Sequence, residues 1–514
     1  MELHRWQSEC LSLWENNGYR GIVNAVTGTG KTFLALSAIS HLETASDKDL
    51  RVKIIVPQTF LAWQWRGEVK RALRVKSRDI GMYYGSRKDH DKKYMIYVIN
   101  SARYNLARHI LTDINSGFAV FLIADECHHY GSPENIRSFD FFRALPKYAP
   151  YYSLGLSATP EIPNYKDITT PLGDEIYRYD FIRALNDGII SKFILFSIRL
   201  DFDCSEAGEY QKLSEDLSIA LKKLWQTRPE LLELTSIQFF SRLRRLAALS
   251  GDDEVSSNAR AAIQLIGKRR TISHLASARI PCALRIVSSL PPDARVILFC
   301  ERVKSAEALA VALQENYPGQ VGIYHSLMED AARQSVLDSY KRGALRLLVC
   351  CRALDEGLNI PSTDAGIIVA STMSIRQRIQ RLGRLLRHSK DIKRIYYLYI
   401  DAAREEEELV LGLDELKDTA LNDAAPSISL QFKMGAFYNE DYETLRARVH
   451  VFLQNRNTDK SLREAINRNL DLALARGDFL LPESVCRERH RLASADRNYW
   501  ASVIYAVLAR TGKL

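Results

Sequence analysis

The sequence predicts an α/β protein with two parallel-sheet domains, a helical insertion between them and a helical domain at the C-terminus. Strand-length apolar runs alternate with helical patterns up to about residue 200, and the alternation returns between about residues 281 and 400. Alternation of this kind is typical of parallel sheets with crossover helices. Elsewhere the apolar residues recur at helical spacing. We therefore expect sheet domains at 1–200 and 281–400, a helical insertion or linker at 201–280 and a helical domain at 401–514.

The composition is that of a soluble protein with a basic balance. The chain has 514 residues and a formal net charge of +9, which favours polyanionic partners such as nucleic acid. Its eight cysteines include no Cys-x-x-Cys pair, so we expect reduced thiols and no zinc or iron–sulfur site. The N-terminus lacks the order of a signal peptide, and no apolar run is long enough to span a membrane. These features predict a cytoplasmic protein with no membrane contact.

A glycine-rich loop at residues 25–32 follows the first strand pattern and leads into a helical pattern. Such a strand, loop and helix point backbone N–H groups and the positive end of a helix at one place, where a triphosphate fits. We expect Lys31 to reach the β and γ phosphates of ATP and the Thr32 hydroxyl to bind Mg²⁺. Ala25 stands where the first glycine of such loops is expected, and Gly28 partly restores backbone freedom. The expected ATP contacts in the loop are Thr27, Gly28, Thr29, Gly30, Lys31 and Thr32.

Two adjacent carboxylates follow the apolar run at residues 119–124. Acidic side chains at the end of a buried strand are costly unless a cation and a reacting water use them. We expect Asp125 to hold Mg²⁺ and Glu126 to polarise the water that attacks the γ-phosphate.

The motifs around this acidic pair resemble those of the superfamily 2 helicases. Residues 125–128 read Asp-Glu-Cys-His and match their DExH box, and residues 157–159 match the Ser-Ala-Thr motif that follows it. The resemblance implies two RecA-like domains, and it implies that Ser157, Thr159 and His128 couple the nucleotide state to a nucleic-acid cleft. Residues 3–7 resemble the adenine-reading segment, with Gln7 as the base-reading residue and Arg5 or Trp6 flanking the ring.

The second sheet domain carries no phosphate loop of its own, which suits a domain that completes the first site. Residues 297–301 and 354–361 resemble motifs IV and V, and Gly357 is assigned to ATP binding. Residues 377–387 resemble motif VI. On a helix Gln380, Arg384 and Arg387 share one face at i, i+4 and i+7. Two guanidiniums one turn apart can clamp a developing phosphate charge, so we assign Arg384 and Arg387 as arginine fingers and place Gln380 with them.

The sequence of motif VI most resembles that of the branch containing the XPB-type DNA translocases and the motors of restriction systems. This resemblance favours DNA over RNA. Motif V departs from that branch in having Cys351 in place of Thr and Asn359 in place of Asp. Cys351 is a weak phosphate donor. The expected nucleic-acid contacts are Gln58, Thr59, Ser101 and Cys351.

The sequence thus predicts an ATP- and Mg²⁺-dependent helicase or translocase that acts on DNA, and it leaves unwinding and duplex translocation both open. The alternative is a nucleic-acid-sensing subunit that uses ATP to recruit a protein partner through its C-terminal domain, for instance in defence against foreign DNA. A basic run at 242–270 is either a solvated face or a phosphate-tracking surface.

Overall fold

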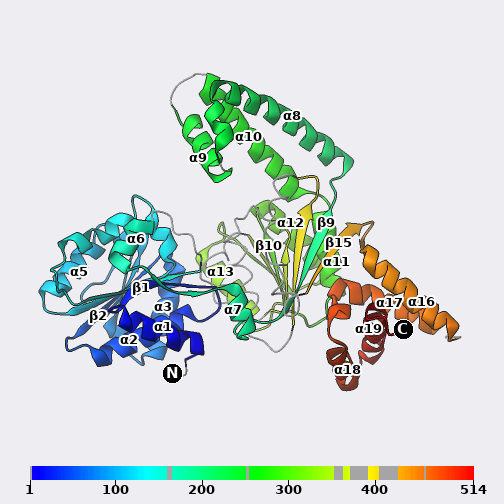
Figure 1. Cartoon of the computed structure of the whole chain (residues 1–514), viewed down its shortest axis with the longest axis horizontal. Helices are drawn as coiled ribbons and strands as arrows, with labels where there is room; N and C mark the ends of the chain where they lie inside the picture. The colour runs from blue at the N-terminus through cyan, green and yellow to red at the C-terminus, as the bar shows by residue number, and fades with distance from the viewer. Residues whose placement is uncertain are drawn as a thin grey trace. The chain divides into compact units, whose positions relative to one another are not determined.

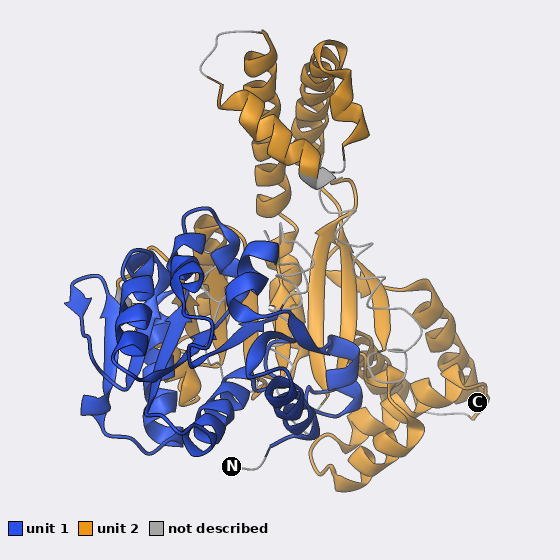
Figure 2. Ribbon diagram, turned by 60° about the vertical axis from the view of Figure 1, so that its left-hand side comes forward, with its two compact units in different colours: residues 1–192, 354–362, 373–391 blue, residues 193–353, 363–372, 392–514 orange. Residues whose placement is uncertain are grey.

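The computed structural model (Figure 1) describes residues 3–158, 165–234, 236–249, 254–351, 363–370, 392–403, 426–456 and 459–514. The chain divides into two compact units (Figure 2). Among the described residues, the first unit ends at Lys192 and the second begins at Phe193.

The first unit is built on an eight-stranded sheet with the order β4-β3-β5-β2-β6-β7-β1-β8. Among the described residues, all of its strand pairs are parallel except β3 with β4. All residues of β6 are buried, as expected for a parallel strand that is covered on both faces. The strands are β1 (Arg20–Ala25), β2 (Leu50–Val56), β3 (Ile80–Tyr84), β4 (Arg87–Lys88), β5 (Tyr94–Val98), β6 (Ala119–Ala124), β7 (Tyr151–Ser157) and β8 (Glu175–Tyr179).

Helices cover both faces of this sheet, with α5 and α6 on one side and α1, α2 and α3 on the other (Figure 1). The α-helices are α1 (Arg5–Asn16), α2 (Lys31–Ala45), α3 (Thr59–Ala72), α4 (Ile99–Ala102), α5 (Leu106–Asn115), α6 (Tyr165–Leu172) and α7 (Phe181–Asn186). Short 3₁₀ helices are η1 (Ser77–Asp79), η2 (Cys127–Gly131) and η3 (Ile136–Ala144).

The second unit holds another eight-stranded sheet, with the order β11-β12-β10-β13-β14-β9-β15-β16. Only the β15–β16 pair is antiparallel among its described pairings. Its strands are β9 (Phe193–Leu200), β10 (Val296–Cys300), β11 (Val321–Tyr324), β12 (Leu347–Cys351), β13 (Ala365–Ile368), β14 (Lys393–Ile400), β15 (Ser427–Lys433) and β16 (Ala436–Tyr438). The two mostly parallel sheets are those of tandem RecA-like domains.

The position of β9 moves the expected boundary between the first sheet domain and the insertion. Residues 193–200 pair along their whole length with β14 and also pair with β15, so they belong to the second sheet. A boundary at residue 200 would separate this strand from its hydrogen-bonding partners. The strand carries no motif, and its apolar run alone cannot show which sheet it joins.

The insertion after β9 is helical, as expected, and has a small core of its own that includes Leu217, Leu224 and Leu243. It consists of α8 (Cys204–Thr227), η4 (Pro229–Glu233), α9 (Ser236–Ala247) and α10 (Glu254–Leu275). The sheet of the second unit is then covered by α11 (Arg279–Ser289), α12 (Val303–Asn316) and α13 (Asp330–Lys341).

The C-terminal helices share their core with the second sheet. Buried residues of these helices, such as Leu470 and Val503, lie in the same apolar cluster as Phe196 of β9 and Tyr396 of β14. The helices are α16 (Glu440–Asn455), α17 (Lys460–Arg476), η5 (Asp478–Leu480), α18 (Glu483–Leu492) and α19 (Arg497–Arg510). Across the described ranges, none of the helices has the length and apolar character that a membrane crossing needs.

Candidate nucleotide-binding site

The expected ATP contacts of the first unit meet at the carboxyl edge of its sheet. Strands β6, β7 and β1 are neighbours and run parallel, and they end at Ala124, Ser157 and Ala25. The loops that follow parallel neighbours emerge at one edge. The glycine-rich loop and the acidic pair therefore share this edge although about one hundred residues separate them.

The glycine-rich loop has the backbone conformation that a phosphate cradle requires. Gly28 and Gly30 have φ angles of 91° and 94°, in the left-handed region that favours glycine. The Thr29 hydroxyl donates to the Val26 carbonyl at 2.8 Å, and the Lys31 ammonium donates to the Ala25 carbonyl at 2.8 Å. Helix α2 begins at Lys31, and Thr32 lies in its first turn. The N-cap residue of this helix is Gly30, which has no side chain to cap the N-terminal N–H groups.

Gln7 joins the start of α1 to the end of this loop. Its side chain is 1% exposed. Its Oε1 accepts from the His4 N–H at 2.9 Å, and its Nε2 donates to the Gly30 carbonyl at 3.1 Å. The predicted base reader is therefore already in contact with the phosphate loop.

Trp6 does not lie as the sequence suggested. Its side chain is 1% exposed and stacks on the Tyr179 ring, with centroids 4.7 Å apart. A ring buried in this way is not available to flank an adenine. Arg5, whose side chain is 92% exposed, remains a candidate for that position.

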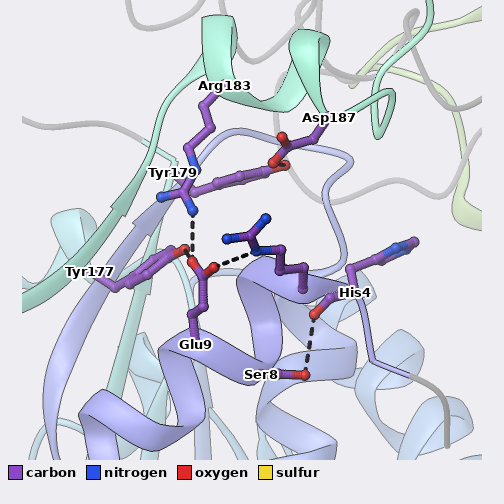
Figure 3. Close-up of polar contacts among 8 residues, drawn as sticks. His4, Ser8, Glu9, Tyr177, Tyr179, Arg183 and Asp187 are labelled. Atoms are coloured by element: carbon purple, nitrogen blue, oxygen red, sulfur yellow. Dashed lines mark hydrogen bonds and ion pairs between the residues drawn. The ribbon is translucent and has the colours of Figure 1, made fainter.

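A cluster of polar contacts around Glu9 fixes α1 against the last elements of the first unit (Figure 3). The Glu9 carboxylate accepts from the Tyr177 hydroxyl at 2.9 Å, from Arg183 at 2.7 Å and from Arg5 at 2.9 Å. These hydrogen bonds, that from Tyr177 above all, lower the pKa of Glu9. The Arg183 guanidinium also lies 5.4 Å from the ring centroids of Tyr177 and Tyr179. Helix α1 is thereby tied to β8 and α7.

The acidic pair is buried beside the loop. Asp125 and Glu126 are each 7% exposed. The indole N–H of Trp65 donates to Asp125 Oδ2 at 2.7 Å, and the Glu126 N–H donates to Asp125 Oδ1 at 3.1 Å. Burial, together with the neighbouring Glu126 carboxylate, raises the pKa of Asp125 above its usual value. A divalent cation would remove this penalty on the charged form.

Glu126 has the geometry of a strained functional residue. Its φ angle is 49°, in the left-handed region that a non-glycine residue adopts only at a cost. Its Oε2 is buried, receives no hydrogen bond from the part of the chain that the structure describes, and lies 3.6 Å from Nδ1 of His128. His128 Nδ1 is in turn 3.2 Å from the Ser157 hydroxyl. The structure thus links the DExH box to the strand end that carries the Ser-Ala-Thr motif.

These residues fit a bound nucleoside triphosphate with its metal ion. Two buried polar atoms, the Thr27 hydroxyl and Glu126 Oε2, have no hydrogen-bond partner among the described residues. Buried polar groups of this kind normally find a partner. A phosphate group and a water molecule at this edge would provide such partners, and the Asp125 oxygens retain acceptor capacity for a hydrated cation.

The expected nucleic-acid contacts lie on two different units. Gln58 and Thr59 stand at the start of α3, and Ser101 lies on α4, where its hydroxyl accepts from the Gly85 N–H at 3.1 Å. Cys351 ends β12 in the second unit and is 3% exposed. The remaining predicted site residues lie outside the described residues, namely Thr159, Gly357, Asn359, Gln380, Arg384 and Arg387.

Two residues at the site had no signal in the sequence. Trp65 hydrogen-bonds Asp125, and Glu9 anchors α1 to β8 and α7. Neither residue belongs to a motif that specifies nucleotide chemistry. A tryptophan in an amphipathic helix is usually a core residue, and a glutamate on a helix face is usually solvated.

Comparisons with known proteins agree with the motifs. Residues 1–162 match the model described as "Type III restriction enzyme, res subunit", and residues 279–389 match "Helicase conserved C-terminal domain". The DNA 3'-5' translocase XPB2 of Sulfurisphaera tokodaii is 27% identical over 389 residues, which cover 75% of this chain and 79% of that protein. Two relatives from Haloarcula marismortui and Halobacterium salinarum are matched over only 52% and 55% of their lengths.

Solved structures agree on the fold. The Hef helicase domain of Pyrococcus furiosus superposes with a TM-score of 0.52 at 16% identity, over 80% of this chain and 98% of that one. The helicase MrfA, bound to DNA and AMPPNP, gives a TM-score of 0.56 at 12% identity, over 84% of this chain and 52% of that one. Taken with the DExH box and the paired sheets, these matches show that the chain belongs to the superfamily 2 helicases, related to the XPB and restriction-motor branches.

Proposed function

We propose that this superfamily 2 enzyme binds ATP with Mg²⁺ in the first unit and uses its hydrolysis to move along DNA. The observation that carries the proposal is the buried acidic pair beside the glycine-rich loop, where Glu126 Oε2 has no hydrogen-bond partner among the described residues. DNA is favoured over RNA because the relative XPB2 is described as a DNA translocase.

Each residue of the site has a role in this reaction. Lys31 would exchange its bond to the Ala25 carbonyl for the β and γ phosphates, and the α2 N–H groups would hold the phosphate oxygens. Thr32 and Asp125 would hold Mg²⁺, which when bound neutralises developing phosphate charge. Glu126 would orient and polarise the attacking water.

The contact between His128 and Ser157 supports a coupling role for this pair. His128 lies next to the Glu126 carboxylate and contacts Ser157 at the end of β7. A change at the γ-phosphate position that moved Glu126 would therefore also move the Ser-Ala-Thr motif. On the strength of their motifs, we place Thr159 in the same coupling pathway and Gly357 among the ATP contacts. Gln380, Arg384 and Arg387 would complete the site.

The names of the related proteins, which are helicases and a translocase, favour a motor over a sensing subunit. A protein partner for the C-terminal helices remains a prediction from the sequence.

The test is ATP turnover by the purified chain with single-stranded, double-stranded and forked DNA and with RNA. We expect stimulation by DNA, and we expect Glu126→Gln to lose turnover by about 10²- to 10⁴-fold while it still binds ATP. Absence of stimulation by every nucleic acid would contradict the proposal. Stimulation by RNA alone would contradict the choice of DNA.

A further inference from the structure

Trp65 makes a direct contact with the predicted metal ligand. Its indole N–H donates to Asp125 Oδ2 at 2.7 Å. The Trp65 side chain is 1% exposed and Asp125 is 7% exposed, so water does not compete for this bond. A hydrogen bond to a charged acceptor in such surroundings is stronger than one between neutral groups.

The bond is the only one that Oδ2 of Asp125 receives from the described residues. The other oxygen, Oδ1, accepts from the Glu126 N–H. The carboxylate is therefore held at both oxygens, by a backbone group on one side and by an indole from α3 on the other. Each oxygen keeps a free lone pair for a further partner. The indole thus fixes the orientation of the carboxylate without occupying all of its acceptor capacity.

Helix α3 connects this hydrogen bond to the predicted nucleic-acid contacts. The helix begins at Thr59, shortly after β2 ends at Val56, and the predicted nucleic-acid contacts Gln58 and Thr59 are its N-cap and its first residue. Trp65 lies on the same helix, about two turns further along. A displacement of α3 by bound nucleic acid would therefore move the donor that orients Asp125.

We propose that Trp65 is a positioning residue that orients Asp125 for Mg²⁺ and links this carboxylate to the nucleic-acid contact at the start of α3. The proposal rests on the function proposed above. Groups that orient a metal ligand typically change metal affinity by about 10- to 100-fold when they are removed. We expect an effect of that size on the Mg²⁺ dependence of nucleotide binding.

Two substitutions separate the hydrogen bond from the packing of the ring. Trp65→Phe keeps most of the aromatic bulk and removes the donor. Trp65→His loses bulk but retains a ring N–H, since its Nε2 occupies the ring position of the indole Nε1. The control is Trp14→Phe, because Trp14 is also 1% exposed and its indole donates to the Ser153 carbonyl at 2.8 Å, away from the acidic pair.

The first readout is the Mg²⁺ concentration that half-saturates binding of a fluorescent, non-hydrolysable ATP analogue. We expect Trp65→Phe to need about 10- to 100-fold more Mg²⁺ than the unchanged protein. Trp65→His should lie closer to the unchanged protein, and Trp14→Phe should match it. A role in packing alone would reverse the order of the two Trp65 variants, and that result would overturn the proposal. Equal Mg²⁺ dependence of Trp65→Phe and Trp14→Phe would overturn it as well.

The second readout is the ratio of ATP turnover with and without DNA at saturating Mg²⁺. We expect this ratio to fall in Trp65→Phe and to be kept in Trp14→Phe. An unchanged ratio would overturn the link to the nucleic-acid contact. Failure of the proposed function would look different, because the unchanged protein itself would then show no stimulation.

Discussion

Gly30 combines two constraints at a single residue. Its φ angle of 94° is unfavourable for any side chain, and a Cβ there would lie 2.8 Å from Nε2 of Gln7. Gly117 has a nearly equal φ angle of 91° but has no atom within 4 Å of a Cβ. The two glycines therefore separate the backbone strain of an alanine from its effect on the nucleotide site.

We predict that Gly117→Ala loses about 1–2 kcal/mol of stability from the left-handed backbone, and that Gly30→Ala loses at least as much because it also displaces Gln7. Only Gly30→Ala should also lose affinity for ATP, by about 10-fold or more, because Gln7 must leave the Gly30 carbonyl. Thermal unfolding and binding of a labelled ATP analogue measure the two effects. Equal ATP affinity of the two variants would show that the Gln7 contact does not matter for binding.

The sequence predicts the residues of the loop and of the acidic pair because their chemistry is local. The spacing of Gly28, Gly30 and Lys31 and the neighbouring carboxylates are all visible within a few residues. Trp65 is different, since it meets Asp125 across 60 positions of the chain. Only the pairing of β2 with β6 in the folded sheet brings α3 to the acidic pair. The burial of Trp6 against Tyr179 could not be predicted from the sequence for the same reason.

At the scale of elements, α7 is the last helix before the chain passes to the second unit, and it is fixed to α1. Arg183 of α7 bonds to Glu9 at 2.7 Å, and α1 also carries Gln7. This arrangement ties the helix that carries the predicted base reader to the segment that leaves the first unit. Arg178 of β8 makes an ion pair of the same length with Glu175 but does not reach α1.

We predict that Arg183→Ala weakens binding of a labelled ATP analogue by about 2- to 10-fold, the value of one hydrogen bond. Arg178→Ala should leave the affinity unchanged. The side chains of Arg183 and Arg178 are 41% and 56% exposed, so neither substitution should lower stability much. A loss of affinity in both variants, or in neither, would contradict a specific role for the Arg183–Glu9 pair.

At the scale of the whole molecule, the motifs predicted two sheet units correctly but not the limits of the second. Strand β9 enters from residues before the insertion, and β15 and β16 enter from residues after 426. These strands carry no motif, and strand pairing over more than 200 residues has no local signal. Removal of residues 430–514 would cut β15 and expose the core that the C-terminal helices share with the second sheet.

A buried ion pair joins the C-terminal helices to the second sheet. Arg394 of β14 bonds to Asp478 at 2.6 Å, and the Tyr499 hydroxyl donates to the same carboxylate at 2.6 Å. The side chains of Arg394 and Asp478 are 12% and 2% exposed. The more exposed pair between Arg446 of α16 and Asp471 of α17, at 2.9 Å, provides a comparison within the C-terminal helices.

We predict that Asp478→Ala destabilises the second unit by about 3–5 kcal/mol, because it leaves a buried guanidinium and a buried hydroxyl without their acceptor. Asp471→Ala should cost less than about 1 kcal/mol, since its partner remains in water. Thermal unfolding of the full chain, followed by circular dichroism, measures both. Because the first unit has a sheet and an apolar core of its own, the Asp478→Ala variant should keep its affinity for a labelled ATP analogue below its unfolding transition. Similar unfolding temperatures of the two variants would mean that the C-terminal helices are held to the sheet by apolar contacts alone.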